Sequence, residues 1–141
     1  MLGAYALSFF IGGMRKFGYT SIMNDCIFCN IAAHEIPAHI VYEDDSFIAF
    51  LDIHPRAPGH VQVIPKHHYR WVWDVPNAGD YFTVVQTIAR AQQRAFGTEL
   101  IRSQIYGEEI PHAHIWVWPD TPLDGSETDF AAIAERLKQA Q

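Results

Sequence analysis

The segment Pro111-His112-Ala113-His114-Ile115-Trp116-Val117-Trp118-Pro119 alternates between polar or aromatic side chains and small or aliphatic ones. Successive side chains of a β-strand point to opposite faces of the sheet. The alternation therefore predicts a strand over residues 112–118, with the two histidines and the two tryptophans on one face. Two imidazoles on one strand face can act on a single ligand, although His-x-His is also compatible with a polar strand face that has no function.

The rest of the chain predicts four more strands and two helices. The apolar runs 39–43 and 46–52, separated by Asp44-Asp45, are typical of a hairpin, and residues 59–65 and 99–106 are two further strands. Residues 80–96 have one apolar face at helical spacing and predict a helix that ends before Gly97. Residues 126–140 begin with a capping-box pattern at Ser126 and Asp129 and predict a terminal helix. The expected fold is α+β, an antiparallel five-stranded sheet with helices on one face.

Length and composition limit the function classes. The chain has 141 residues, of which 49% are hydrophobic and 18% charged, which excludes a disordered chain and suits one domain. Its net charge of −6 argues against a nucleic-acid partner. Only two cysteines are present, so we expect no disulfide framework. We expect a reducing, cytoplasmic location instead. We expect the domain to span residues 23–141.

Residues 1–22 form an N-terminal extension with three interpretations. It is a poorly ordered tail or a mis-assigned start ahead of Met23, an added element that covers a neighbour or a partner, or a membrane anchor. The anchor is the least favoured, because the uncharged stretch before Arg15 is shorter than the about 20 apolar residues that a bilayer requires. No membrane partner is expected.

The pair Cys26-Ile27-Phe28-Cys29 is the first chemical motif in chain order. Two thiolates at this spacing together with two distant imidazoles suit structural Zn²⁺. The alternatives are a redox pair or two buried small residues. A redox pair of this kind opens a helix in a βαβ unit, and the sequence shows no such unit.

Asp52 and His60 flank a Pro- and Gly-rich loop. Asp52 ends a predicted strand, where a carboxylate can accept hydrogen bonds from two vicinal hydroxyls, or it is an ordinary residue that starts a turn. His60 begins the next predicted strand and is equally compatible with a surface histidine.

Taken together, the motifs resemble the histidine triad (HIT) family of nucleotide-binding hydrolases and transferases. The resemblance runs over residues 26–119 and is carried, in the family's order, by CIFCNI, EIPAHIVYEDDSFIAFLDI, PGHVQVIPKHH and HAHIWVWP. It implies an α+β fold, a two-fold homodimer with a continuous sheet, and a purine nucleotide or nucleotide conjugate as ligand.

The resemblance also implies roles for individual residues. His114 matches the nucleophile that attacks the α-phosphorus, with Nδ1 donating to a backbone carbonyl so that Nε2 attacks. Asp52 matches the carboxylate that binds ribose. The remaining nucleotide-binding positions are Ile27, Phe28, Ile31, Phe50, Ile53 and His60. Structural Zn²⁺ would be held by Cys26, Cys29, His68 and His112, with His67 as the alternative to His68.

Two departures from the family pattern bear on activity. Trp116 stands where the third histidine is expected, and Glu108-Glu109 stand where the family often has Gln-Ser against phosphate. Either the carboxylates point outward, or a divalent cation joins them to the substrate phosphate, or the substrate differs. The expected function is a nucleotidyl hydrolase or transferase with a covalent nucleotidyl-histidine intermediate. The alternatives are a catalytically weak nucleotide-binding module and a dimeric interaction protein whose surface carries Trp71, Trp73, Trp116 and Trp118.

Overall fold

The computed structural model describes residues 25–141, which belong to two compact units. The first unit, within Met1–Pro37, is described over residues 25–37, and the expected extension 1–22 lies outside the described residues. Its helix α1 (Ile27–Ala32) has Cys26 as N-cap, whose Sγ accepts the N–H of Cys29 at 3.4 Å. No helix is predicted over these residues from the sequence.

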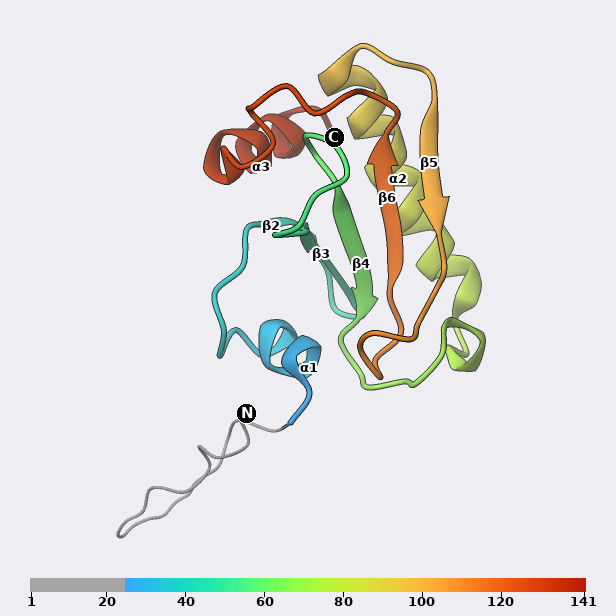
Figure 1. The fold of residues 1–141 in the computed structure, drawn as a ribbon. Helices are drawn as coiled ribbons and strands as arrows, with labels where there is room; N and C mark the ends of the chain where they lie inside the picture. The colour runs from blue at the N-terminus through green and yellow to red at the C-terminus, as the bar shows by residue number, and fades with distance from the viewer. Residues whose placement is uncertain (1–24) are drawn as a thin grey trace, which may run out of the picture. The chain divides into compact units, whose positions relative to one another are not determined.

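The second unit, Ala38–Gln141, contains the predicted five-stranded antiparallel sheet. Its strands lie in the order β2-β3-β4-β6-β5 (Figure 1). Their bounds are β2 (Ile40–Glu43), β3 (Phe47–Leu51), β4 (Val61–Pro65), β5 (Ile101–Gln104) and β6 (Ile115–Pro119). The predicted hairpin is the β2–β3 pair, and Asp44 Oδ1 fixes its turn by accepting the N–H groups of Ser46 and Phe47 at 2.8 Å.

Two long helices of the second unit, α2 (Ala78–Phe96) and α3 (Phe130–Gln139), pack into one hydrophobic core with the sheet (Figure 1). Tyr81 and Ile88 of α2 and Leu137 of α3 are fully buried in this core. The Tyr81 hydroxyl also donates to the Val63 carbonyl of β4 at 2.8 Å. A short 3₁₀ helix, η2 (Val72–Asp74), precedes α2. The α+β class is therefore confirmed.

Two predicted boundaries are wrong. Strand β6 begins at Ile115, so His112 and His114 precede the strand. The reason is that the N–H of Ala113 donates to the Tyr69 carbonyl at 2.7 Å outside the β4–β6 pairing. Helix α3 begins at Phe130 rather than near Ser126.

The start of α3 is displaced because another hydrogen bond captures the expected cap. The Ser126 N–H and hydroxyl donate to Asp124 Oδ1 at 2.9 and 2.6 Å, which forms a turn, and Asp129 becomes the N-cap. The predicted terminal helix is nevertheless present, and it buries Ile133, Ala134 and Leu137 on one face. None of the helices within residues 25–141 has both the length and the apolar character needed to cross a membrane.

Candidate active site and metal site

His114 lies immediately before β6 and is 2% exposed. Its Nδ1 donates to the His112 carbonyl at 2.7 Å, which is the orientation expected from the sequence. A carbonyl oxygen only accepts, so Nδ1 carries a hydrogen and Nε2 is the nitrogen left for chemistry. Nε2 lies 3.2 Å from Glu109 Oε1. The structure thus gives the buried imidazole a fixed orientation and a carboxylate at its reactive nitrogen.

The loop that carries Glu109 is held at its start by two residues that precede η2. The Arg70 guanidinium lies 3.7 Å from the centre of the Trp71 ring and donates to the Gly107 carbonyl at 2.8 Å. Gly107 has φ +91°, and a Cβ atom there would lie 2.9 Å from the Trp71 ring. Only glycine fits this approach without strain.

Of the alternatives for the two glutamates, an outward-pointing Glu109 is wrong, because its carboxylate lies against His114 Nε2.

Asp52 and His60 lie close together between β3 and β4. Asp52 directly follows β3 and is 9% exposed. Its Oδ1 accepts the His54 N–H at 2.7 Å, and Oδ2 accepts Gln62 Nε2 at 3.0 Å. Each carboxylate oxygen offers about two acceptor sites, so both retain capacity for a further donor.

His60 is 2% exposed, so the surface-histidine alternative is wrong. Its Nδ1 accepts the Arg56 N–H at 3.0 Å, and Nε2 lies 3.7 Å from Asp52 Oδ2, too far for a hydrogen bond. Burial lowers the pKa of His60 to about 4, against the opposing effect of the Asp52 charge, and Arg56 lowers it further. The imidazole is therefore neutral at pH 7 and carries its hydrogen on Nε2.

Trp116 occupies the outer, half-buried face of the sheet, where β6 pairs it with Gln62 of β4 and Gln104 of β5. The Arg56 guanidinium lies 4.8 Å from the Trp116 ring centre and 5.0 Å from that of Trp118, and it donates to Gln104 Oε1 at 3.1 Å. Trp116 Nε1 is buried and has no hydrogen-bond partner among the described residues. Arg56 is a site residue that the sequence reasoning missed, and its only signal is a single cation in the loop between Asp52 and His60.

The four predicted metal ligands form a candidate metal site. One ligand atom from each of Cys26, Cys29, His68 and His112 lies within 4.8 Å of the others. Two thiolates and two imidazoles are a donor set that suits Zn²⁺. The alternative ligand His67 is outside the group, and its ring packs on Tyr69 at 4.8 Å between ring centres.

The environment of His112 suits a metal ligand. The ring is fully buried, and Nε2 donates to the Pro65 carbonyl at 2.8 Å, which leaves Nδ1 for an ion. Burial lowers the pKa of His112 to about 4, so the imidazole is neutral. Metal ligands need a neutral imidazole, and a backbone carbonyl on the second ring nitrogen is the usual way to orient one.

The residues predicted to surround a base differ in exposure. Phe28 and Ile31 of α1 and Phe50 of β3 are buried, whereas Ile27 and Ile53 are exposed. Of the four tryptophans in the predicted interaction surface, Trp71 and Trp73 are exposed, and the two in β6 are half-buried. Both groupings remain predictions.

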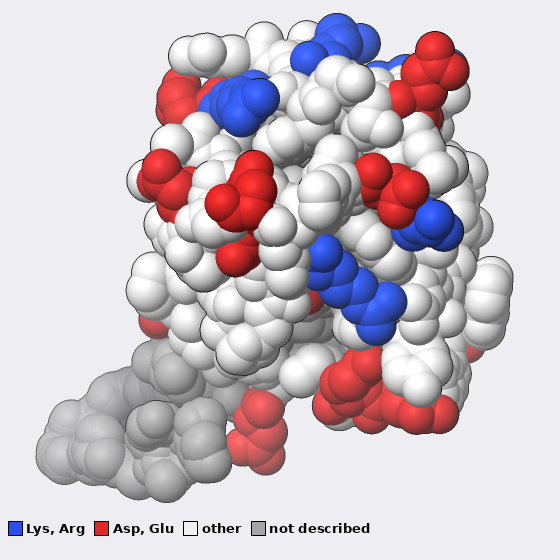
Figure 2. All heavy atoms as spheres, turned by 45° about the horizontal axis from the view of Figure 1, so that its top comes forward, with Lys and Arg blue, Asp and Glu red and all other residues white. Residues whose placement is uncertain are grey.

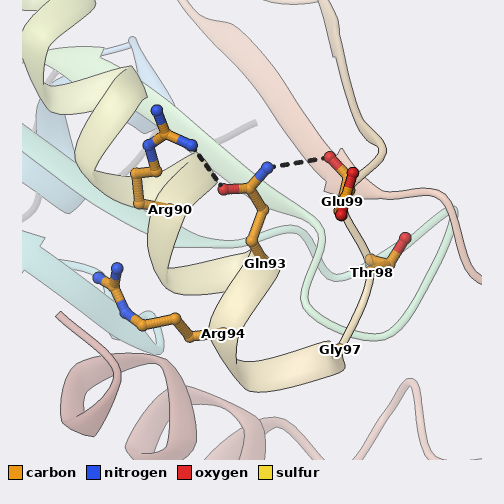
Figure 3. Close-up of a pocket in the computed structure, with 6 residues that line it drawn as sticks. All are labelled: Arg90, Gln93, Arg94, Gly97, Thr98 and Glu99. Carbon is orange, nitrogen blue, oxygen red and sulfur yellow. Dashed lines mark hydrogen bonds between the residues drawn. The ribbon is translucent and has the colours of Figure 1, made fainter.

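A separate surface hollow lies at the C-terminal end of α2 (Figure 3). It is open and polar, and Arg90, Gln93 and Glu99 form a hydrogen-bonded chain along it. The Gln93 side chain accepts from Arg90 at 3.0 Å and donates to the Glu99 carbonyl at 2.9 Å. The hollow shares no residue with the His114 site. In Figure 2 the basic side chains stand in small separate groups among acidic ones on the face shown.

The fold and the site define an α+β protein with a buried, oriented histidine beside a Cys₂His₂ candidate metal site. Comparison with known proteins extends this description. The HIT domain model matches residues 33–123. An uncharacterized HIT-like protein of Methanocaldococcus jannaschii is 35% identical over 114 residues, which cover 77% of this chain and 88% of that protein. The adenosine 5′-monophosphoramidase of Saccharomyces cerevisiae is 33% identical over 127 residues, covering 81% of this chain and 79% of that enzyme. The chain therefore belongs to the HIT family.

Solved structures agree with this assignment. A HIT-like protein from Bartonella henselae has a TM-score of 0.74 at 33% identity and covers 86% of this chain and all of its own. A Zn-bound histidine triad family protein from Mycobacterium smegmatis has a TM-score of 0.70 at 28% identity, covering 82% of this chain and 92% of its own. The predicted family and fold are thus confirmed.

Proposed function

We propose that the protein is a nucleotide hydrolase that passes the nucleotidyl group of a nucleoside phosphoramidate or related conjugate through His114. The observation that carries this proposal is the buried His114, whose Nδ1 is tied to the His112 carbonyl at 2.7 Å. That bond points Nε2 at Glu109 Oε1, 3.2 Å away, and Nε2 becomes the nucleophile when the carboxylate moves aside and no proton remains on this nitrogen. The similarity to an adenosine 5′-monophosphoramidase supports a substrate of this class.

The proposed reaction has two steps. In the first, the Nε2 lone pair forms a bond to the α-phosphorus, the bond from phosphorus to the leaving group breaks, and the leaving group departs with that electron pair and takes up a proton. In the second, water attacks the same phosphorus and gives up a proton, and the phosphorus–nitrogen bond breaks so that His114 regains its lone pair. A different acceptor in place of water would make the protein a transferase.

Asp52 is the proposed ribose-binding group. Its two oxygens are held by the His54 N–H and the Gln62 amide, which fixes the carboxylate plane. The remaining acceptor sites would receive the 2′- and 3′-hydroxyls in charge-assisted hydrogen bonds. The proposed wall around the base is formed by Ile27, Phe28, Ile31, Phe50 and Ile53. The proposed nucleotide-binding residue His60 lies with its Nε2 3.7 Å from Asp52 Oδ2.

Cys26, Cys29, His68 and His112 are proposed to hold Zn²⁺. A closed set of two thiolates and two imidazoles suits a structural ion, which stabilises the fold and leaves no open position for a substrate. In this arrangement His112 is a ligand and His114 is the nucleophile. His112 and His114, separated by one residue, thus have separate roles. The divalent cation considered for the substrate phosphate remains a proposal without support from the described residues.

A second candidate function is nucleotide binding without useful turnover. Trp116 supports it, because an indole in the third histidine position carries no charge and its buried Nε1 has no described partner. The deciding experiment is mass spectrometry of the intact protein after mixing with an adenylyl phosphoramidate. A nucleotidyl adduct in the wild type that is absent in His114→Ala supports the hydrolase. Binding of the nucleotide without any adduct or product supports the binding module.

We also propose a two-fold homodimer through α2 and β5. Phe82 of α2 and Leu100 before β5 are 43% and 51% exposed, so these elements present apolar side chains to a partner. Light scattering at micromolar concentration tests this, and a monomeric mass would contradict it.

A further inference from the structure

The carboxylate of Glu109 lies where a substrate has to be. Its Oε1 is 3.2 Å from His114 Nε2, the nitrogen that forms the bond to phosphorus in the proposed reaction. Reacting atoms in a productive complex approach to about 3–3.5 Å before the bond forms. The Glu109 carboxylate therefore occupies the position of the substrate's phosphoryl group, and it has the same sign of charge and the same hydrogen-bonding character.

We propose that Glu109 is a specificity-determining residue that selects ligands by the charge on their α-phosphate. This inference rests on the proposed function. Glu109 disfavours a doubly charged nucleoside monophosphate, which is the product, more strongly than a singly charged phosphoramidate or ester, which is the substrate class. It thereby limits occupation of the site by product.

The loop geometry keeps this carboxylate near the site after a ligand enters. Gly107 is held by the Arg70 hydrogen bond and by contact with Trp71, so the backbone two residues before Glu109 is fixed. The Glu109 side chain is 40% exposed, so its route away from Nε2 leads toward solvent. A ligand can therefore displace the carboxylate from Nε2, but the anchored loop keeps its negative charge on the same side of the site as the phosphate.

The charge of the ligand then decides how strongly the Glu109 carboxylate repels its phosphate. A phosphate monoester has a second pKa near 6 and carries a charge of about −2 at pH 7, whereas a conjugate with one ionised oxygen carries −1. Coulomb repulsion scales with the product of the charges, so Glu109 acts about twice as strongly on the product. Adenosine has no phosphate and experiences no such repulsion.

The test compares Glu109→Gln with Glu108→Gln. Both substitutions remove one negative charge from adjacent exposed residues, but only Glu109 contacts His114. Dissociation constants are measured by calorimetry at pH 7.5 for adenosine, for AMP and for the singly charged methyl ester of AMP. We expect Glu109→Gln to tighten AMP about tenfold and the methyl ester less, with adenosine unchanged. Glu108→Gln should change all three by less than about twofold, and the gain should shrink in high salt.

The outcomes separate the two proposals. If adenosine and AMP bind the wild type and Glu109→Gln leaves their affinity ratio unchanged, the role of Glu109 is overturned while the proposed function stands. An equal gain in Glu108→Gln also overturns it, since the effect would then be one of net charge. If no variant binds any of the three ligands, the proposed function fails and this inference fails with it. Glu109→Ser serves as a second variant, and a retained melting temperature shows that the loop still folds.

Discussion

His60 should make the stability of the protein sensitive to pH between about 6.5 and 4. Burial lowers its pKa from 6.5 to about 4 in the folded protein, so the unfolded chain binds this proton more readily. Stability rises with pH wherever the unfolded state holds more protons. The contribution is therefore complete above pH 6.5, declines as the pH falls, and is lost below pH 4. Asp52 opposes the shift and Arg56 adds to it, but burial is the largest cause.

The magnitude follows from the two pKa values. A difference of about 2.5 units at about 1.4 kcal/mol per unit gives a total loss of about 3 kcal/mol, of which about 2 kcal/mol is reached at pH 5. Such a loss is a large part of the 5–15 kcal/mol that is typical of a domain. His60 makes ring contacts with Trp116 and Trp118, so its protonation should also disturb the outer face of the sheet.

The assay is urea denaturation of the wild type and of His60→Gln at pH 7.5 and pH 5. The variant should be less stable at pH 7.5, because it loses the buried ring, but the wild type should lose about 2 kcal/mol more than the variant on acidification. The proposed metal ligands and the carboxylates are the same in both proteins, so their contributions cancel in the difference. His54→Gln, at an exposed histidine, is the control and should behave like the wild type. Equal acid sensitivity of wild type and His60→Gln would refute the reasoning.

Three further predictions concern the proposed function. Asp52→Ala should weaken the binding of a ribonucleotide about ten- to a hundredfold in calorimetry, since charge-assisted hydrogen bonds contribute roughly 1.5–3 kcal/mol each. The affinity for a 2′,3′-dideoxynucleotide should stay nearly unchanged. Equal losses for both ligands would contradict the ribose-binding role. Trp116→His should raise turnover tenfold or more if the missing third histidine limits the rate, because one such donor is typically worth 10²–10³ in rate; no gain in steady-state assays would direct attention to Glu109. Chelation of the metal, or Cys26→Ser, should remove about one zinc per chain by metal analysis and lower the melting temperature, whereas a metal-free wild type would contradict the assigned site.

The elements that could be predicted from sequence are those encoded by local signals. The hairpin with Asp44-Asp45 was predictable because the turn carboxylate and both apolar runs are adjacent in the chain. The β6 boundary was not, because alternation shows which side chains share a face and not which backbone groups pair. The N–H of Ala113 is used by Tyr69, which is far away in sequence. At α3, a capping pattern at Ser126 competed with Asp124, and the sequence holds both options.

In the candidate site, too, some residues could be predicted from the sequence and others could not. The candidate metal ligands and His114 were assigned through the resemblance to HIT-family motifs, and the four candidate ligands lie within 4.8 Å of one another in the structure. Glu109 and Arg56 are exposed charged residues on loops, and such residues carry no periodic signal. Whether Glu108 or Glu109 turns toward His114 depends on the loop conformation that follows Gly107, which is set by contacts with a distant segment.

The contact of Arg70 and Trp71 with Gly107 has a consequence for the kinetics of ligand entry. Because the backbone at Gly107 is already fixed, removal of the Glu109 carboxylate from Nε2 requires rotation of one exposed side chain and no opening of the loop. Exposed side chains change rotamer in picoseconds to nanoseconds, whereas larger collective rearrangements take microseconds to milliseconds. Nucleotide association should therefore follow a single phase whose observed rate rises linearly with ligand concentration, without the plateau that a slow gating step would impose.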